Sequence, residues 1–445
     1  MYGRKRGVWR GIQWAIWVGC LVLTAGWASG EEGLWRREPV TISPDSGWCW
    51  FQDERAIVDN GRLLASGVAS NGDVMVTVYE FATGESEDIV LHEGFEENDH
   101  CVPALFARPD GRYLAAYSHH HGDQLMRYRI SEEPGNPYAW EPEQHADAGA
   151  NITYSNLYYL AEEDRLYNFH RGVGWNPNYM ISEDAGSTWR YGGQLLWMPD
   201  NRRPYPRYAG DGESTIHFVT TDAHPQHYPA SVYHGFIRGG EVHASDGTVV
   251  GALSEEAETN IRPEDLTLLF EAAEERMGWT SDIRLDAEGR PYVGYIVTHD
   301  YDLEAREGGD DRRYHYARWD GEEWRDHEIA HGGTKLYHGE FHYAGLITLH
   351  PDDPDQVFIS TDVDPDSGVS LDSGHHEIFH GLTDDGGATW TWTAITTDSE
   401  ADNIRPIVTS GDARGAVVWL RGRYTTYRDY SLEAVGIPWM AGEEE

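Results

Sequence analysis

Cysteine is scarce in this chain. The sequence has three cysteines, and Cys20 lies in an apolar amino-terminal run that we expect to be removed, which leaves Cys49 and Cys101. Two isolated cysteines provide no disulfide framework. Export would permit one disulfide between them, and two free buried thiols agree equally well with the sequence. The 40% hydrophobic content is ample for a buried core without cross-links.

Positive charge is also scarce. The chain carries 34 basic against 76 acidic residues, a formal net charge of −42. Such a surface disfavours binding to nucleic acid and to anionic membranes. It suits salty surroundings, where screening relieves the self-repulsion. An anionic substrate would need a locally basic pocket, so the few arginines are more informative than the many carboxylates.

Long apolar runs are absent beyond the amino terminus, and no low-complexity linker divides the chain. A basic start precedes the apolar run 12–25, and small residues cluster at 28–30. This run is short for a membrane span. Because it continues past Cys20, a lipid anchor on that cysteine is disfavoured. We therefore expect a signal peptide at 1–30 and one exported domain at 31–445, secreted or periplasmic.

Short apolar runs recur along the chain, separated by turns rich in Gly, Asp and Asn. Such turns supply the positive φ values that tight hairpins need. They stand at residues 59–62, 109–112, 210–212, 287–290 and 410–412, with others near Glu163 and Asp353. This spacing gives about seven units of propeller-blade length. The sequence predicts an all-β fold, a seven-bladed β-propeller, with one helical stretch at 266–275 between blades.

Two segments share the pattern Ser/Thr-x-Asp-x-Gly-x-Thr-Trp, at residues 182–189 and 383–390. We expect Asp184 and Asp385 to cap the amides of an outer turn, the following Gly to take the left-handed conformation, and the Trp to pack between blades. The pattern resembles the Asp-box of bacterial neuraminidase repeats. The box is structural, so it supports the fold and not a particular chemistry.

The side chains best suited to proton transfer lie between residues 98 and 171. His100 and His120 flank one predicted strand pair, and Tyr154 and Arg171 flank the next. Two adjacent blades can therefore bring all four to one face of the propeller. With 22 histidines in the chain, such a pair can also arise by chance, as polar strand ends or a metal-binding tract.

This set of side chains suits β-elimination from a uronic acid. The reaction needs a positive group to neutralise the carboxylate, which acidifies the neighbouring carbon-bound proton, and Arg does this with paired donors. It also needs a base near neutral pH, which His provides, and an acid for the leaving glycosidic oxygen, which Tyr or His provides. No metal or other cofactor is required for this chemistry.

Several motifs together resemble the propeller polysaccharide lyases, which include the ulvan lyases and related lyases that cut rhamnosyl-glucuronate bonds. The resemblance covers most of the mature chain. It marks the superfamily well and separates its members poorly. The motifs are residues 47–56, 99–100, 153–156, 178–182, 203–208, 231–234 and 402–406.

The resemblance implies a site of two His from adjacent strands, a Tyr and an Arg, which by motif are His100, His120, Tyr154 and Arg171. We expect Arg171 to neutralise the carboxylate, assisted by one His. Tyr154 or the other His would take the proton, and Tyr154 would protonate the leaving oxygen. A Tyr beside cationic groups can have a lowered pKa.

The position of the second His is ambiguous by one residue, because His119 and His121 flank His120. Strand alternation would turn both neighbours away from the side that His120 faces. The resemblance also implies three residues that line the substrate canyon: Tyr205, Arg207 and Tyr208.

The sequence leaves a structural zinc or calcium ion open, but the signals for both are incomplete. Some ulvan lyases carry a structural zinc held by His and Cys; His224 and His234 match part of that site, but Val232 stands where the Cys would be. Residues 362–368 resemble a calcium loop, but the Gly is one place late for an EF-hand and no helices flank it.

The best-supported function is a lyase acting on an anionic, ulvan-like polysaccharide, with no nucleic-acid or membrane partner after signal cleavage, and as a monomer. A glycoside hydrolase on the same propeller, such as a sialidase or an α-L-rhamnosidase, is an alternative. The other is a non-catalytic carbohydrate-binding propeller, for which 18 Trp and 26 Tyr would supply stacking surfaces.

Overall fold

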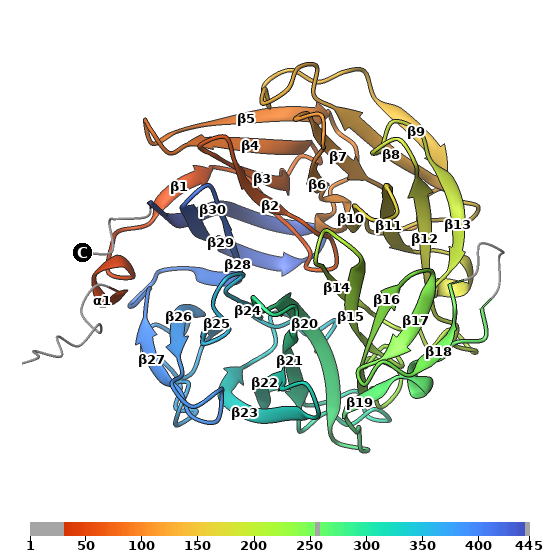
Figure 1. Ribbon diagram of the computed structural model, residues 1–445. Coiled ribbons are helices and arrows are strands. Elements are labelled where there is room, and N and C mark those ends of the chain that lie inside the picture. Colours follow the sequence, from red (N-terminus) through yellow and green to blue (C-terminus); the bar gives the residue numbers. More distant parts are fainter. Residues whose placement is uncertain (1–30, 254–258, 441–445) are drawn as a thin grey trace, which may run out of the picture.

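The computed structural model describes residues 31–253 and 259–440, so the expected signal peptide lies outside the described residues. Seven antiparallel sheets stand around a central axis in a closed ring (Figure 1). The all-β, seven-bladed propeller is thus confirmed. No helix in the described part of the chain has the length and apolar character to cross a membrane.

Blades 1 to 3 are four-stranded sheets in which sequential strands pair from the axis outward. Blade 1 comprises β2 (Ala56–Asp59), β3 (Arg62–Val68), β4 (Val74–Glu80) and β5 (Glu85–His92). Blade 2 comprises β6 (Ala104–Ala107), β7 (Tyr113–Tyr117), β8 (Leu125–Ile130) and β9 (Gln144–Asp147). Blade 3 comprises β10 (Leu157–Leu160), β11 (Arg165–Arg171), β12 (Pro177–Ser182) and β13 (Arg190–Gln194).

Blades 4 to 6 continue the ring, and blade 4 has two extra strands. Blade 4 comprises β14 (Arg207–Gly210), β15 (Thr215–Thr221), β16 (Val232–Arg238), β17 (Glu241–Ala244), β18 (Val249–Ala252) and β19 (Thr267–Phe270). Blade 5 comprises β20 (Met277–Leu285), β21 (Pro291–Thr298), β22 (Arg312–Trp319) and β23 (Trp324–Gly333). Blade 6 comprises β24 (Ile347–Leu349), β25 (Gln356–Thr361), β26 (Glu377–Leu382) and β27 (Thr391–Ala394).

Blade 7 closes the ring by joining both ends of the domain. It comprises β28 (Asp402–Gly411), β29 (Arg414–Thr426), β30 (Asp429–Met440) and β1 (Val40–Ser43). The amino-terminal β1 pairs with the carboxy-terminal β30 as the outermost strand, and β28 contacts β2 at the axis. The described helical elements are short: α1 (Glu31–Leu34), η1 (Asp99–Cys101), η2 (Val173–Trp175) and η3 (Pro263–Asp265).

The two Asp-box turns form as expected. Asp184 accepts the Thr188 amide at 2.8 Å in the β12–β13 turn, and Asp385 accepts the Thr389 amide at 2.9 Å in the β26–β27 turn. Gly387 has φ +101°, and an added Cβ would meet the ring of Tyr316 in blade 5 at 2.5 Å. The Asp-box thus tightens the outer edge of one blade against its neighbour.

The expected helix at 266–275 is wrong, because residues 267–270 form strand β19. This strand pairs antiparallel with β16, where Val232 lies opposite Phe270. Strand β17 covers only the carboxy-terminal half of β16, which leaves the backbone groups at its start without partners. Because buried backbone groups require hydrogen bonds, β19 completes the ladder despite the helix-forming residues that follow it.

The connection from β1 to β2 crosses the middle of the ring, and we call residues 47–55 the central segment. The Trp48 indole donates to the Arg405 carbonyl in blade 7 at 3.1 Å, and the Trp50 indole donates to the Thr280 carbonyl in blade 5 at 3.2 Å. Both indoles are almost fully buried. The central segment therefore fills the axis and joins blade 7 to blade 5.

The two cysteines within the described residues are buried and free. Cys49 belongs to the central segment, and Cys101 ends η1. The structure thus favours the free thiols of the two alternatives that the sequence left open.

Candidate functional site

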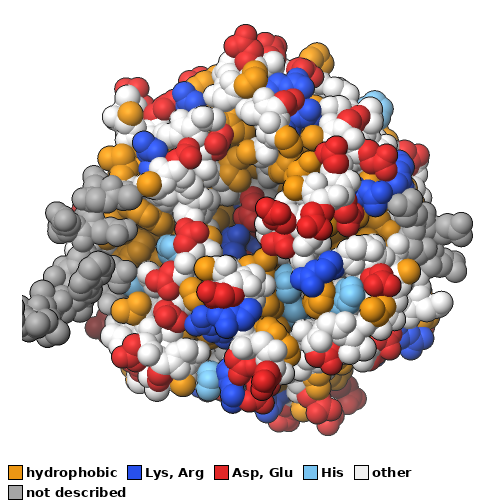
Figure 2. Space-filling view, viewed as in Figure 1, with side chains coloured by type: hydrophobic (Ala, Val, Ile, Leu, Met, Phe, Trp, Pro, Cys, Tyr) orange, Lys and Arg blue, Asp and Glu red, His pale blue; other side chains and the backbone are white. Residues whose placement is uncertain are grey.

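One face of the ring is hollowed near its centre, with His, Arg or Lys, and Asp or Glu side chains around the hollow (Figure 2). A pocket that contains the residues of interest has an empty volume of about 650 Å³. The central segment contributes to its lining, and loops from blades 2 to 7 surround it. The lining residues are Trp50, Phe51, His100, His120, Tyr154, Arg171, Trp175, Arg203, Tyr205, His224, Trp279, Glu340, His342, Tyr343 and Tyr427.

All four residues expected to be catalytic line this pocket. His100 lies in η1 just before β6, His120 follows β7, Tyr154 precedes β10, and Arg171 ends β11. Each therefore stands at the same end of the first or second strand of its blade. Antiparallel hairpins place these positions side by side, so two neighbouring blades deliver the set to one cleft.

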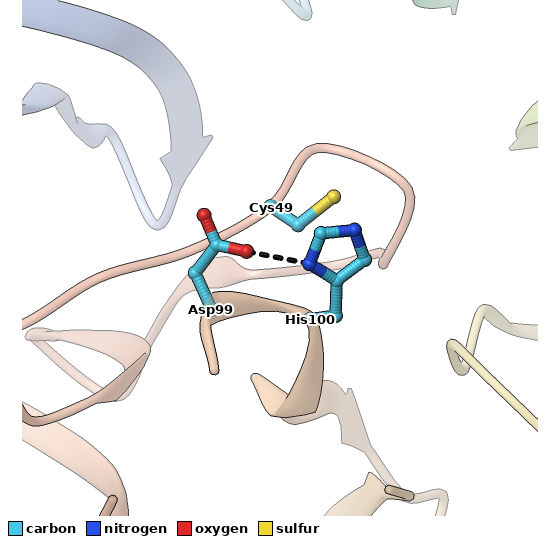
Figure 3. Close-up of side chains that lie close together, drawn as sticks. All are labelled: Cys49, Asp99 and His100. Atoms are coloured by element: carbon cyan, nitrogen blue, oxygen red, sulfur yellow. Dashed lines mark hydrogen bonds and ion pairs between the residues drawn. The ribbon is translucent and has the colours of Figure 1, made fainter. Parts of the chain in front are cut away.

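His100 is held as a cation by its neighbours. Its Nδ1 lies 2.6 Å from the Asp99 carboxylate, and the Cys49 thiol lies over the same ring (Figure 3). Burial lowers the pKa of His100, but Cys49 and Asp99 outweigh burial and raise that pKa to about 9. The Tyr343 hydroxyl lies 3.1 Å from Nε2. His100 is consequently a positive hydrogen-bond donor at neutral pH.

His120 has the opposite protonation state. Its ring stacks on that of His100 with centroids 4.1 Å apart. Burial, and then the positive charges of His100 and Arg171, lower the pKa of His120 well below its usual range. Asn98 accepts the His100 amide through Oδ1 and lies 3.2 Å from His120 Nδ1 through Nδ2. Nδ1 therefore accepts, and Nε2 carries the proton of the neutral ring.

Arg171 is a buried cation whose recorded partners are neutral. Its guanidinium donates to the Tyr205 hydroxyl at 2.6 Å, the Thr153 hydroxyl at 3.1 Å and the Tyr154 hydroxyl at 3.4 Å. The ring of Trp175 packs on it at 4.9 Å. Within the described part of the chain, no carboxylate pairs with Arg171. A buried charge without a counter-ion is costly, so this site favours an anionic ligand.

The lowered pKa expected for Tyr154 is wrong. Burial, and then the neighbouring Tyr205, raise the pKa of Tyr154 well above its usual range, although Arg171 opposes this. The sequence showed the cation beside the phenol but not how completely the phenol is withdrawn from water. Tyr154 is therefore a neutral phenol in the unliganded pocket.

Backbone strain gathers around the same pocket. Four residues other than glycine have positive φ values there or next to it: His121 at +62°, Tyr154 at +75°, Trp175 at +64° and Arg203 at +61°. Such conformations persist only when the surroundings impose them, and they concentrate at functional sites. The strain points to this pocket independently of the ionisable groups.

Of the three consecutive histidines, His120 alone lines the pocket. His119 lies 2.9 Å from the Glu96 carboxylate and stacks on Phe95. His121 stacks on Trp175 with centroids 3.9 Å apart. The three histidines follow the end of β7 and His121 has a positive φ, so their different placements arise from a turn and not from the strand alternation that the sequence analysis assumed.

Two of the three expected canyon residues need correction. Tyr205 lines the pocket, but Arg207 is fully buried beneath the central segment, where it pairs with Asp53 at 2.6 Å and with Asp282 at 3.4 Å. Tyr208 stacks on Phe169 in the blade core and reaches only a smaller adjoining pocket. Both residues belong to β14, whose side chains pack inside the ring instead of facing the cleft.

The partial zinc match also needs correction. His234 bonds Ser245 at 2.8 Å and His217 at 3.2 Å, and it belongs to no convergent ligand group among the described residues. His224 instead lines the pocket beside Glu340 and His342. His342 Nε2 lies 3.2 Å from the Glu340 carboxylate, and burial lowers the pKa of His342.

Several pocket residues were not predicted from the sequence, because they belong to loops that lie far from residues 98–171 in the chain. Trp50 and Phe51 belong to the central segment, His342 and Tyr343 to the β23–β24 connection, and Tyr427 to the β29–β30 turn. The aromatic cluster of the central segment was a visible signal, since it fell in a motif of the resemblance. The other connections carry no pattern that indicates their position.

The family is decided by a match to the model of the BNR repeat-containing family over residues 62–332, more than half of the chain. The chain belongs to this family. The matched BNR repeats span blades 1 to 5, and the Asp-box at 182–189 lies within them. No curated protein matched the chain in a sequence search.

Several solved structures superpose on almost the whole propeller of this BNR-family chain. An ulvan lyase of a polysaccharide lyase family superposes with a TM-score of 0.66 and 16% identity, covering 91% of this chain and 96% of the other. The same kind of enzyme bound to -[GlcA(1-4)Rha3S]- gives a TM-score of 0.65 and 15% identity over the same shares. The polysaccharide lyase Uly1 gives 0.57 and 12% identity, covering 92% and 95%. At these identities the likeness establishes the fold.

Proposed function

We propose that this protein is a secreted polysaccharide lyase that cleaves rhamnosyl-uronate linkages by β-elimination. One observation carries the proposal: the charged His100 and Arg171 and the neutral His120 and Tyr154 line a single buried pocket. That pocket is locally cationic in a chain whose net charge is −42. Its chemistry therefore selects an anion that the rest of the surface repels.

The cationic groups bind the uronate carboxylate. Arg171 offers paired donors, and His100 adds a second positive donor. Neutralising the carboxylate lowers the pKa of the adjacent carbon-bound proton, which is the step that makes elimination feasible. The pocket-facing Nε2–H of His120 contributes a further neutral donor to the same anion.

Proton transfer then falls to Tyr154. Arg171 and the protonated His100 have no lone pair to accept a proton, and Nε2 of His120 already carries one. Tyr154 first loses its phenol proton to solvent; the resulting phenolate removes the ring proton, the electron pair of that carbon–hydrogen bond forms the carbon–carbon double bond, and the glycosidic carbon–oxygen bond breaks. The same hydroxyl returns its proton to the leaving oxygen. Arg171, 3.4 Å away, stabilises the phenolate.

The choice of substrate class has separate support. Trp175 and Tyr427, which line the pocket and are partly exposed, supply aromatic rings on which sugar rings can stack. A structure of the same fold was solved with -[GlcA(1-4)Rha3S]- bound, a uronate joined to a sulfated rhamnose. The aromatic rings favour a carbohydrate ligand, and the uronate bound in that structure favours an ulvan-like polymer over a neutral glycan.

The deciding experiment offers the purified protein a panel of uronate polysaccharides and follows ultraviolet absorbance. A lyase leaves an unsaturated uronate that absorbs, whereas a hydrolase releases reducing ends without absorbance. New reducing ends alone would replace the lyase with a glycoside hydrolase. Binding without either product would leave a carbohydrate-binding propeller.

A further inference from the structure

A second cluster of metal-binding side chains lies in blade 5, and none of its members lines the pocket. His299 follows β21, His315 lies in β22, and Glu328 lies opposite His315 in β23. One ligand atom from each residue lies within 4.8 Å of the other two. Three neighbouring segments of one sheet therefore converge on a single point.

The distances suit one small cation. Zinc binds imidazole nitrogen and carboxylate oxygen at about 2.0–2.2 Å, so its ligand atoms lie about 3–4 Å from one another. The cluster thus needs only a small inward movement of the side chains. Glu328 is 45% exposed, so its carboxylate can move without disturbing the core.

Two ring nitrogens in the cluster have no partner. His299 Nε2 and His315 Nε2 are both buried and form no hydrogen bond in the structure. Buried polar atoms are almost always satisfied, so an unpartnered ring nitrogen on each of the two histidines of this cluster favours a site that binds a ligand. The His315 side chain is only 7% exposed. Its Nε2 is therefore a buried atom that can offer its lone pair to a metal ion.

The surroundings set the tautomer that a metal requires. His315 Nδ1 lies 3.4 Å from the Asp326 carboxylate and 3.2 Å from the Tyr295 hydroxyl. With the proton on Nδ1, the lone pair of Nε2 is free. Metal-bound histidines characteristically donate their other nitrogen to a carboxylate in this way.

The ligand set selects the type of ion. Calcium and magnesium prefer oxygen ligands throughout, whereas two imidazoles with one carboxylate suit zinc and similar first-row divalent metals. Arg313 approaches Glu328 at 3.5 Å but is already held by Asp311 at 2.7 Å. Glu328 is therefore free to turn from a weak ion pair to a metal.

We propose that His299, His315 and Glu328 form a zinc-type site that joins β21, β22 and β23. Three protein ligands leave the fourth tetrahedral position to water. Because the site bridges segments of one blade and lies outside the pocket, its effect is on stability. The proposal does not depend on the lyase function.

The test uses the full chain, stripped with a chelator and titrated with Zn²⁺ by calorimetry and thermal melting. We expect saturable binding and a higher Tm with Zn²⁺, and neither with Mg²⁺ or Ca²⁺. Glu328→Gln and His299→Ala should each weaken this binding about tenfold or more, since each removes a ligand. Both change partly accessible side chains, so folding should survive where the buried His315→Ala could fail.

Two controls assign the site. His327→Ala changes the neighbouring residue in β23, whose side chain points to the opposite face, and should bind Zn²⁺ normally. His342→Ala removes one possible ligand from the cluster of His224, Glu340 and His342 in the pocket. This variant should also leave the blade 5 site intact. Unchanged Zn²⁺ binding in Glu328→Gln and His299→Ala, or loss in His342→Ala alone, would overturn the proposal. So would equal stabilisation by Mg²⁺.

Discussion

At the scale of single residues, the same burial produces opposite outcomes in two stacked imidazoles. His100 is buried against Asp99 and remains charged, whereas His120 is buried against cations and remains neutral. Tyr154 is likewise kept as a phenol. Protonation state in this pocket is therefore decided by each group's immediate partner and not by residue type.

Replacing Tyr154 by Phe removes one hydroxyl and nothing else from the pocket. We expect the rate of unsaturated-product formation to fall by about a hundredfold or more, because the proton carrier is lost. The thermal midpoint should stay close to that of the parent protein. Tyr159→Phe is the matched control and should keep full activity, because the Tyr159 hydroxyl donates to the Asp164 carboxylate at 2.6 Å and Tyr159 does not line the pocket. Undiminished turnover by a folded Tyr154→Phe protein would rule out the proposed mechanism.

The pH dependence of turnover follows from two groups. The reactive phenolate of Tyr154 becomes more abundant as pH rises, because its pKa is raised. His100 must stay protonated, and with a pKa of about 9 it loses its charge above that pH. We therefore expect turnover to rise from neutrality toward pH 9 and to fall beyond it, measured by initial rates at saturating substrate. A rate independent of pH across this rise would assign proton removal to His120.

At the scale of elements, the central segment links the site to the scaffold. It supplies Trp50 and Phe51 to the pocket, while Asp53 beneath them pairs with the buried Arg207. Burial raises the pKa of Asp53 to about 6, and the charge of Arg207 opposes that shift. The segment is thus anchored by charges that are costly to bury singly.

Arg207→Met should test this anchor. Removing the guanidinium leaves Asp53 and Asp282 without their shared partner, so we expect a loss of about 3–5 kcal/mol in the free energy of unfolding. Urea titration followed by Trp fluorescence measures it. Arg423→Met breaks an exposed pair with Asp429 and should cost less than about 1 kcal/mol. Equal losses of unfolding free energy in the two variants would show that Arg207 does not anchor the central segment.

At the scale of the whole molecule, an acidic ring surrounds a cationic pocket. The seven blades are closed by the pairing of β1 with β30, so the ends of the domain are tied together. With a net charge of −42, the excess carboxylates on the surface of the propeller repel one another. Stability should therefore depend on screening as well as on packing.

Thermal unfolding at increasing salt tests that dependence. The Debye length falls from about 30 Å at 0.01 M to about 10 Å at 0.1 M, which screens distant carboxylates from one another. We expect the Tm to rise over this range, and NaCl and KCl to act equally at equal ionic strength. A Tm that falls or stays constant would show that self-repulsion does not limit stability.

The propeller architecture, and the four residues proposed to act in the candidate pocket, could be predicted from the amino-acid sequence. Regular turns, alternating apolar runs and two Asp-boxes are local signals, and local signals are sufficient when every blade repeats the same unit. His100, His120, Tyr154 and Arg171 could be proposed together because they flank consecutive hairpins.

Only the tertiary structure decided the remaining features, because they depend on burial and on contacts between distant segments. It placed Arg207 under the central segment, made β19 a strand by giving it an unpaired edge of β16, and brought His342 into the pocket. It also set the charge of each stacked imidazole. Desolvation and neighbouring charge are properties of the folded surroundings, and no residue carries them in its identity alone.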